Sequence, residues 1–231
     1  MKRKGKIYID IRTDRWEPWT GCVKFSEGCK HCWAIYSLNR LKKKGISPYR
    51  DMADPFHFSL NNNELQEPSL FDLPKNVVVP KRIWVCDRSD PFFDEKNQNG
   101  EYLLPDEAIL RAFYIMGKVP QHRFIVCTKR AERLAELGPK LPWKPWIWAA
   151  VTIESAKHLP KLEALKSCGA LNKFIQFEPL LGKMPDFNTD GIDFIAVGGE
   201  AGPYARPMQA DWVRHLRDMA QSEEVAIKKI S

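Results

Sequence analysis

The chain has 231 residues, a formal net charge of +7, and hydrophobic residues at 44% of its positions. This length and apolar content suffice for one large α/β domain, and no apolar run is long enough to cross a bilayer. The basic N-terminal residues 1–6 are not followed by an apolar signal region, and six cysteines without the spacing of a disulfide framework fit a reducing compartment. We therefore expect a cytoplasmic protein with no membrane partner.

Short β-branched or aromatic runs recur along the chain and predict strands. The eight runs are 6–11, 56–60, 82–86, 123–127, 146–151, 173–177, 194–197 and 225–230. Apolar runs without alternation are typical of strands that are buried on both faces, as in a parallel sheet.

Segments with apolar residues at helical spacing lie between several of these strands. The expected helices are 32–44, 105–118, 131–137, 160–166 and 209–221, and the polar segments 61–80 and 92–104 are expected to be loops. Alternating strands and helices predict an α/β fold, a parallel (βα) barrel or a partial TIM-like barrel, in a single domain over residues 1–231. A doubly wound open sheet is the alternative, although no Gly-rich dinucleotide loop follows the first strand.

Three cysteines, Cys22, Cys29 and Cys32, lie close together between the first expected strand and the first expected helix. Three thiolates with no fourth cysteine nearby indicate a metal or [4Fe–4S] site in which one coordination position stays open for a small molecule. We expect the cluster-binding loop to span residues 20–34. The alternatives are three buried structural cysteines, or a zinc site that His31 or a distant ligand completes.

Charged residues follow the ends of several expected strands, which in a parallel barrel meet at one mouth. These residues are Asp87, Asp90, Lys129, Arg130, Glu154, Glu178 and Glu200. Charges of mixed sign around one cavity suit a zwitterionic cofactor, and Gly198-Gly199 would let the backbone approach a ligand closely. We expect Asp90, Gly198, Gly199 and Glu200 to bind the cofactor, and Lys129, Glu154 and Glu178 to be catalytic.

The positive charge gathers in three clusters, at 2–6, 40–44 and 228–229. Such a balance favours polyanionic partners, either nucleic acid or a phosphorylated substrate. Ordinary solvated lysines would give the same pattern at any single cluster.

Seven short motifs occur in order along nearly the whole chain. They are WEPWTGC at 16–22, GCKHCWA at 28–34, SDPF at 89–92, CTKR at 127–130, FEPLLG at 177–182, GGEAG at 198–202 and ARPM at 205–208. Together they make the chain resemble the phage-associated three-cysteine family, whose members are regarded as relatives of radical S-adenosylmethionine (SAM) enzymes.

The resemblance implies a [4Fe–4S] cluster on Cys22, Cys29 and Cys32, with SAM bound to the open iron and an external electron donor. It implies that a 5′-deoxyadenosyl radical takes hydrogen from a substrate, which we expect to be a nucleic-acid base or nucleotide, as in phage DNA hypermodification. The location would then be the host cytoplasm if the protein is phage-encoded.

Two features differ from the usual radical SAM pattern. Six residues separate Cys22 from Cys29 instead of three, and the Gly-Gly-Glu triplet follows the seventh expected strand rather than the second. The assignment of Glu200 to the amine of SAM therefore stays open. The alternative function is a non-enzymatic zinc or iron–sulfur protein that binds nucleic acid through a basic, Trp-rich surface.

Overall fold

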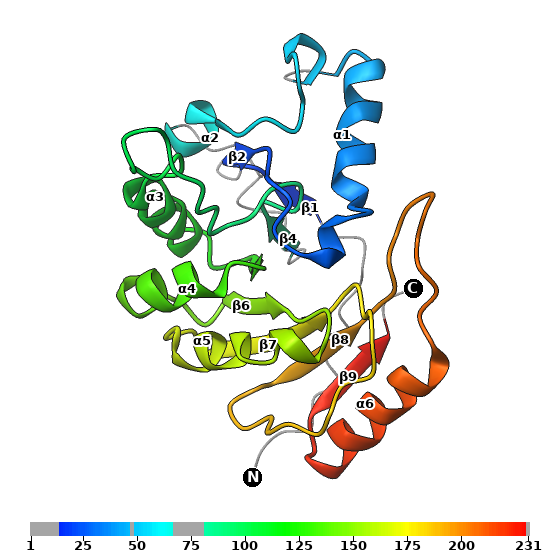
Figure 1. The fold of residues 1–231 in the computed structure, drawn as a ribbon. Coiled ribbons are helices and arrows are strands. Elements are labelled where there is room, and N and C mark those ends of the chain that lie inside the picture. The colour runs from blue at the N-terminus through cyan, green and yellow to red at the C-terminus, as the bar shows by residue number, and fades with distance from the viewer. Residues whose placement is uncertain (1–13, 47–48, 67–80, 230–231) are drawn as a thin grey trace.

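The computed structural model describes residues 14–46, 49–66 and 81–229 (Figure 1). The expected strand 6–11 lies outside these residues. None of the described helices is both long and apolar enough to cross a membrane.

A seven-stranded parallel sheet organises the fold. Its strands lie in the order β1 (Asp14–Trp16), β4 (Arg82–Val85), β5 (Arg123–Thr128), β6 (Ile147–Thr152), β7 (Asn172–Phe177), β8 (Phe194–Val197) and β9 (Ala226–Lys229). Every neighbouring pair is parallel, so each new strand joins the same growing edge. The α/β class and the six expected strands from 82 to 230 are confirmed. Within the described ranges β1 and β9 form the two edges, and the sheet is not closed.

The expected strand 56–60 does not join the parallel sheet, so its predicted place as a barrel strand is wrong. Its last two residues form β3 (Ser59–Leu60), which pairs antiparallel with β2 (Trp19–Thr20) in a separate two-stranded sheet. The physical reason is local: this pairing buries Trp19 and brings the chain before β3 against the start of the cysteine loop, where the Cys22 N–H donates to the Phe56 carbonyl at 3.0 Å.

The five expected helices are confirmed. They are α1 (Trp33–Lys43), α3 (Asp106–Gly117), α4 (Ala131–Leu137), α5 (Lys161–Ser167) and α6 (Ala210–Ser222). The expected loop 61–80 contains a short helix, α2 (Asn62–Gln66), and its remainder from 67 lies outside the described residues. Among the described residues, short 3₁₀ turns connect the elements at Glu27–Cys29, Tyr49–Asp51, Gly138–Lys140 and Ala156–His158.

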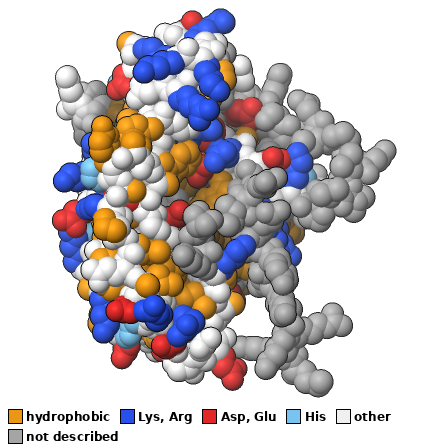
Figure 2. All heavy atoms as spheres, turned by 90° about the vertical axis from the view of Figure 1, so that its right-hand side faces the viewer, with side chains coloured by type: hydrophobic (Ala, Val, Ile, Leu, Met, Phe, Trp, Pro, Cys, Tyr) orange, Lys and Arg blue, Asp and Glu red, His pale blue; other side chains and the backbone are white. Residues whose placement is uncertain are grey.

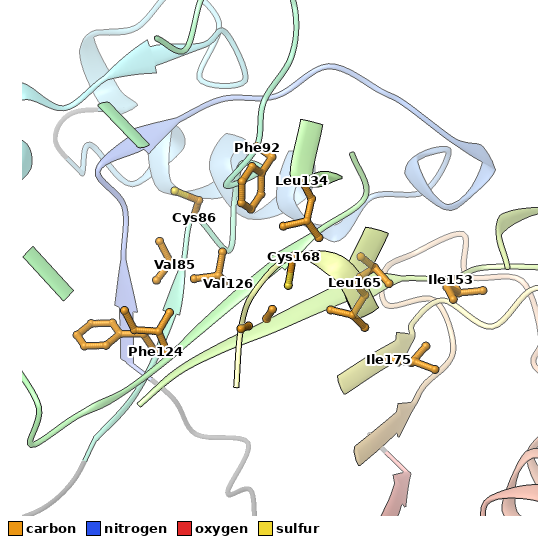
Figure 3. Packing of buried hydrophobic residues seen from close by; sticks show 14 of the residues in the cluster. Val85, Cys86, Phe92, Phe124, Val126, Leu134, Ile153, Leu165, Cys168 and Ile175 are labelled. Atoms are coloured by element: carbon orange, nitrogen blue, oxygen red, sulfur yellow. The ribbon is translucent and has the colours of Figure 1, made fainter. Parts of the chain in front are cut away.

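Alternate residues along each strand point to opposite faces of the sheet, and each face has its own apolar cluster. On one face, Val85, Phe124 and Val126 belong to the main core, which also takes in Leu134 of α4 and Leu165 of α5 (Figure 3). Core residues of α3 and α6 pack into the same cluster, so these helices all cover this face of the sheet. The other face carries a separate, smaller apolar cluster of Ile125, Ala150, Phe174, Phe194 and Ala196, with Trp84, Cys127 and Trp148 against it. We call it the inner face.

Candidate functional site

A cavity of about 360 Å³ lies where the inner face meets the carboxyl ends of the strands. The cysteine loop forms one wall through Cys22, Cys29 and Cys32. Side chains from five successive strands and the segments after them form the rest, including Trp84, Asp90, Cys127, Lys129, Thr152, Phe174, Gln176, Glu178, Phe194 and Glu200. The topology therefore brings the three cysteines and most of the predicted strand-end residues to one place.

The backbone conformation of Gly21 fixes where the cysteine loop begins. Gly21 has φ +82°, and a Cβ atom there would collide with the backbone of His57. The Ser89 hydroxyl donates a hydrogen bond to the Gly21 carbonyl from the segment after β4. A residue with a side chain at position 21 would displace the loop just before Cys22.

Glu154, which follows β6, anchors the middle of the cysteine loop. Its fully buried carboxylate accepts hydrogen bonds from the Ser26 hydroxyl at 2.6 Å and the Gly28 N–H at 3.1 Å, and the Lys129 Nζ lies 3.2 Å away. Burial by itself would raise the pKa of Glu154, but the Lys129 ammonium and these hydrogen bonds outweigh it, so the pKa is lower than usual. Glu154, predicted as catalytic, is thus an ionised residue that holds the loop.

Arg206 holds the same loop from another side. Its guanidinium donates to the Glu27 carbonyl at 2.8 Å and forms an ion pair with Glu200. Glu200 Oε2 also accepts from the Arg206 Nε at 2.9 Å and from the Arg206 backbone N–H at 2.7 Å. The Glu200 side chain, predicted to bind cofactor, is engaged in orienting Arg206 while it lines the cavity.

Asp90 joins the ends of β4 and β5. Its carboxylate accepts from the Thr128 hydroxyl at 2.5 Å, the Lys129 N–H at 3.0 Å and the Phe92 N–H at 2.9 Å. The side chain is buried, and the residue lines the cavity. Asp90 therefore sets the position of Lys129 at the cavity wall.

Glu178 lies on the cavity wall after β7 and accepts a hydrogen bond from the Gln176 amide at 2.8 Å. Burial raises its pKa above the usual value. A Cβ at Gly198 would lie 3.1–3.3 Å from the Glu178 side chain, so Gly198 makes room for Glu178. Gly199 itself lines the cavity.

The chemistry of the three thiols is set by their surroundings. Burial raises the pKa of Cys22 to about 12 and also raises the pKa of Cys32, and the charge of Cys29 acts in the same direction on both. Cys29 is buried, with its sulfur 3.6 Å from the Ser26 hydroxyl. All six cysteines are free.

The donor set is of the kind that holds a metal or iron–sulfur centre, because three thiols of one loop line one cavity. In the described part of the chain, no group of three or more His, Cys, Asp or Glu side chains is arranged to hold a metal ion. In this structure Cys22, Cys29 and Cys32 therefore share a cavity wall without forming a ready-made ligand set.

Two features of the site are not among the sequence predictions. Arg206 is one, although it stands in the ARPM motif. The other is a row of polar side chains on the inner face: Cys127 on β5, Thr152 on β6 and Gln176 on β7. Of these, Cys127 alone is expected from its apolar run to lie in the core or on a pocket wall. The two-residue repeat of strand geometry could have shown the row, since each of the three lies two residues after an apolar inner-face residue and so points to the same face.

Comparison with known proteins identifies a family. A family model described as "Protein of unknown function (DUF5131)" matches residues 7–228, and the chain belongs to this family. No curated protein and no solved structure matches the chain.

Proposed function

We propose that this DUF5131 protein is an enzyme of the radical SAM type that modifies or isomerises a nucleic-acid base or nucleotide. One observation carries the proposal: three cysteines of a single loop line a cavity at the carboxyl ends of a parallel βα sheet. That edge is where βα barrels place their active sites.

The fold supports a partial TIM-like barrel of the radical SAM type. The strands follow one another without reversal, and helices α3 to α6 cover one face only. A doubly wound sheet would reverse its strand order and place helices on both faces. Within the described residues the sheet does not close, so a barrel of this type would be a partial one.

Cys22, Cys29 and Cys32 would hold a [4Fe–4S] cluster. When bound and reduced, such a cluster would supply the electron for cleavage of SAM to methionine and a 5′-deoxyadenosyl radical, which would take a hydrogen atom from the substrate. Glu154 and Arg206 hold the loop, Lys129 pairs with Glu154 at the cavity wall, and aromatic side chains line the cavity. Such a centre needs an external electron donor and a reducing compartment, which we take to be the cytoplasm.

Reductive cleavage of SAM tests the proposal. The full chain, purified without oxygen and reconstituted with iron and sulfide, is incubated with SAM and dithionite, and 5′-deoxyadenosine and methionine are measured by chromatography. We expect both products in equal amounts, and none from Cys29→Ala. Cys168→Ala is the matched control, because Cys168 is buried in the main core and does not line the cavity. A fully iron-loaded protein that leaves SAM intact would contradict the proposal.

A further inference from the structure

We propose that the inner face of the sheet beneath the cysteine loop binds a nucleobase, with Trp84 and Phe174 against its ring and Gln176 and Glu178 reading its edge. This inference rests on the proposed function for its biological meaning, but the binding site is defined by residues that hold no cluster. None of Trp84, Phe174 and Gln176 belongs to the motifs from which the function is proposed.

Aromatic side chains form the floor of the cavity, with their ring planes inclined to one another. Trp84 on β4, Phe174 on β7 and Phe194 on β8 all line it, and the rings of Trp84 and Phe174 meet edge to face with centroids 6.5 Å apart. Trp84 is only partly buried, so part of its ring faces the cavity. Aromatic side chains of this kind bind a planar heterocycle by stacking, worth about 1–3 kcal/mol per base.

The row of polar side chains runs beside this floor, nearer the carboxyl ends. The Cys127 thiol donates to the Gln176 Oε1 at 3.1 Å, and its sulfur lies 3.6 Å from the Thr152 hydroxyl. The Gln176 amide donates one hydrogen to Glu178 and retains a second N–H hydrogen. The amide and the adjacent carboxyl thus offer a donor and an acceptor side by side, the pattern that a base edge requires.

Size and charge agree with a nucleotide. A cavity of about 360 Å³ lies within the usual range for small-molecule sites, roughly 300–1,000 Å³. Lys24 of the cysteine loop lines the mouth and forms no ion pair within residues 14–46, 49–66 and 81–229, so its ammonium can meet a phosphate. Figure 2 shows lysine and arginine side chains gathered over α1, whose last turn carries Arg40, Lys42 and Lys43.

Two sources could present such a base: a free nucleotide, or a nucleotide within a strand. Isothermal titration of the full chain with each of the four deoxynucleoside 5′-monophosphates measures the first. Titration with a single-stranded oligonucleotide rich in the preferred base, and with its duplex, measures the second. Binding of the single strand but not of the duplex would indicate a base taken out of the stack.

Two variants locate the bound base. Gln176→Met keeps the side-chain length but removes the amide, and we expect about tenfold weaker binding. Gln121→Met, at an exposed position outside the cavity, is the matched control and should bind like the wild type. Trp84→Phe keeps an aromatic floor, so it should retain most of the affinity while it loses the quenching of tryptophan fluorescence that the nucleotide causes.

The outcomes separate this inference from the radical SAM proposal. Nucleotide binding that depends on Gln176 and persists in the Cys22→Ser/Cys29→Ser/Cys32→Ser variant supports the base site even if SAM is never cleaved. Absence of binding by all four nucleotides and the oligonucleotide, or equal binding by Gln176→Met, overturns it even if SAM cleavage succeeds. Competition by S-adenosylhomocysteine would also overturn it, because the floor would then belong to the adenine of the cofactor.

Discussion

The Glu154 carboxylate at the end of β6 accepts a hydrogen bond from the backbone N–H of Gly28 at 3.1 Å, so a strand end and the cysteine loop are joined one residue before Cys29. The two residues fit tightly, because a Cβ at Gly28 would overlap the Glu154 carboxylate and lie 3.0 Å from the Pro179 ring. The position of Cys29 therefore depends on an ionised side chain more than one hundred residues away in the sequence.

Glu154→Gln should destabilise the protein and loosen the loop. The substitution leaves the Lys129 ammonium without its carboxylate partner in a largely buried setting, a change that costs about 3 kcal/mol. Urea unfolding should show the loss, and alkylation of Cys29, which is 8% exposed, should become faster. Glu163→Gln on the exposed side of α5 is the control. Equal alkylation rates in both variants would mean that Glu154 does not anchor the loop.

Gly28→Ala should displace the loop without removing any charged group. The new methyl group would have to push away either the Glu154 carboxylate or Pro179, so we expect lower stability and less iron retained after reconstitution. Gly182→Ala is the matched control, because a Cβ there meets nothing within 4 Å. If the two alanine variants behave alike, the close packing of Gly28 against Glu154 has no role.

Arg206→Gln should weaken the second anchor. It removes the hydrogen bond to the Glu27 carbonyl and leaves the Glu200 side chain, which is 2% exposed, as an unpaired carboxylate, at a cost of about 2 kcal/mol. Adding Glu200→Gln should recover part of this loss, because the buried charge disappears. Denaturant unfolding of the single and double variants measures this coupling. Arg214→Gln is the control, because Arg214 forms an exposed ion pair with Asp211. Strict additivity of the two substitutions would contradict the proposed coupling.

Glu17 should make stability depend on pH. Burial and the nearby Asp87 raise the pKa of Glu17 from 4.5 to about 8, against a smaller opposing effect of Arg88. The folded chain therefore retains this proton up to about pH 8, whereas the unfolded chain loses it near 4.5, so the stability linked to Glu17 falls as pH rises across this window. We expect the melting temperature of Glu17→Gln, measured relative to that of the wild type, to be several degrees higher at pH 9 than at pH 4. A pH-independent difference would show that Glu17 is not protonated in the folded state.

The sheet and its helices could be predicted from the sequence because their signals are local. Runs such as 123–127 lack polar alternation, which predicts a strand buried on both faces. The segment 105–118 has apolar residues at helical spacing, which predicts an amphipathic helix. The segment 56–60 carries apolar residues that are common in strands, but its pairing with Trp19 and Thr20 decides its place, and that pairing is not local.

The roles of the site residues were harder to predict than their location. The positions of Glu154, Glu178 and Glu200 after the ends of parallel strands predict that they meet at one cavity. These positions do not show that Glu154 and Glu200 help to hold the cysteine loop. These roles depend on distances between side chains distant in sequence, such as Arg206 and Glu27. Gly198 is a further example. The sequence predicts that it lets the backbone approach a ligand, but the structure shows that a side chain there would crowd Glu178.

The most direct measurement is the iron and sulfide content of the anaerobically reconstituted chain, together with its absorption spectrum. We predict a brown protein with about four irons and four sulfides per chain, and loss of this content in each of Cys22→Ala, Cys29→Ala and Cys32→Ala but not in Cys168→Ala. A colourless chain that carries zinc, or iron that survives loss of any one of the three cysteines, would contradict the account.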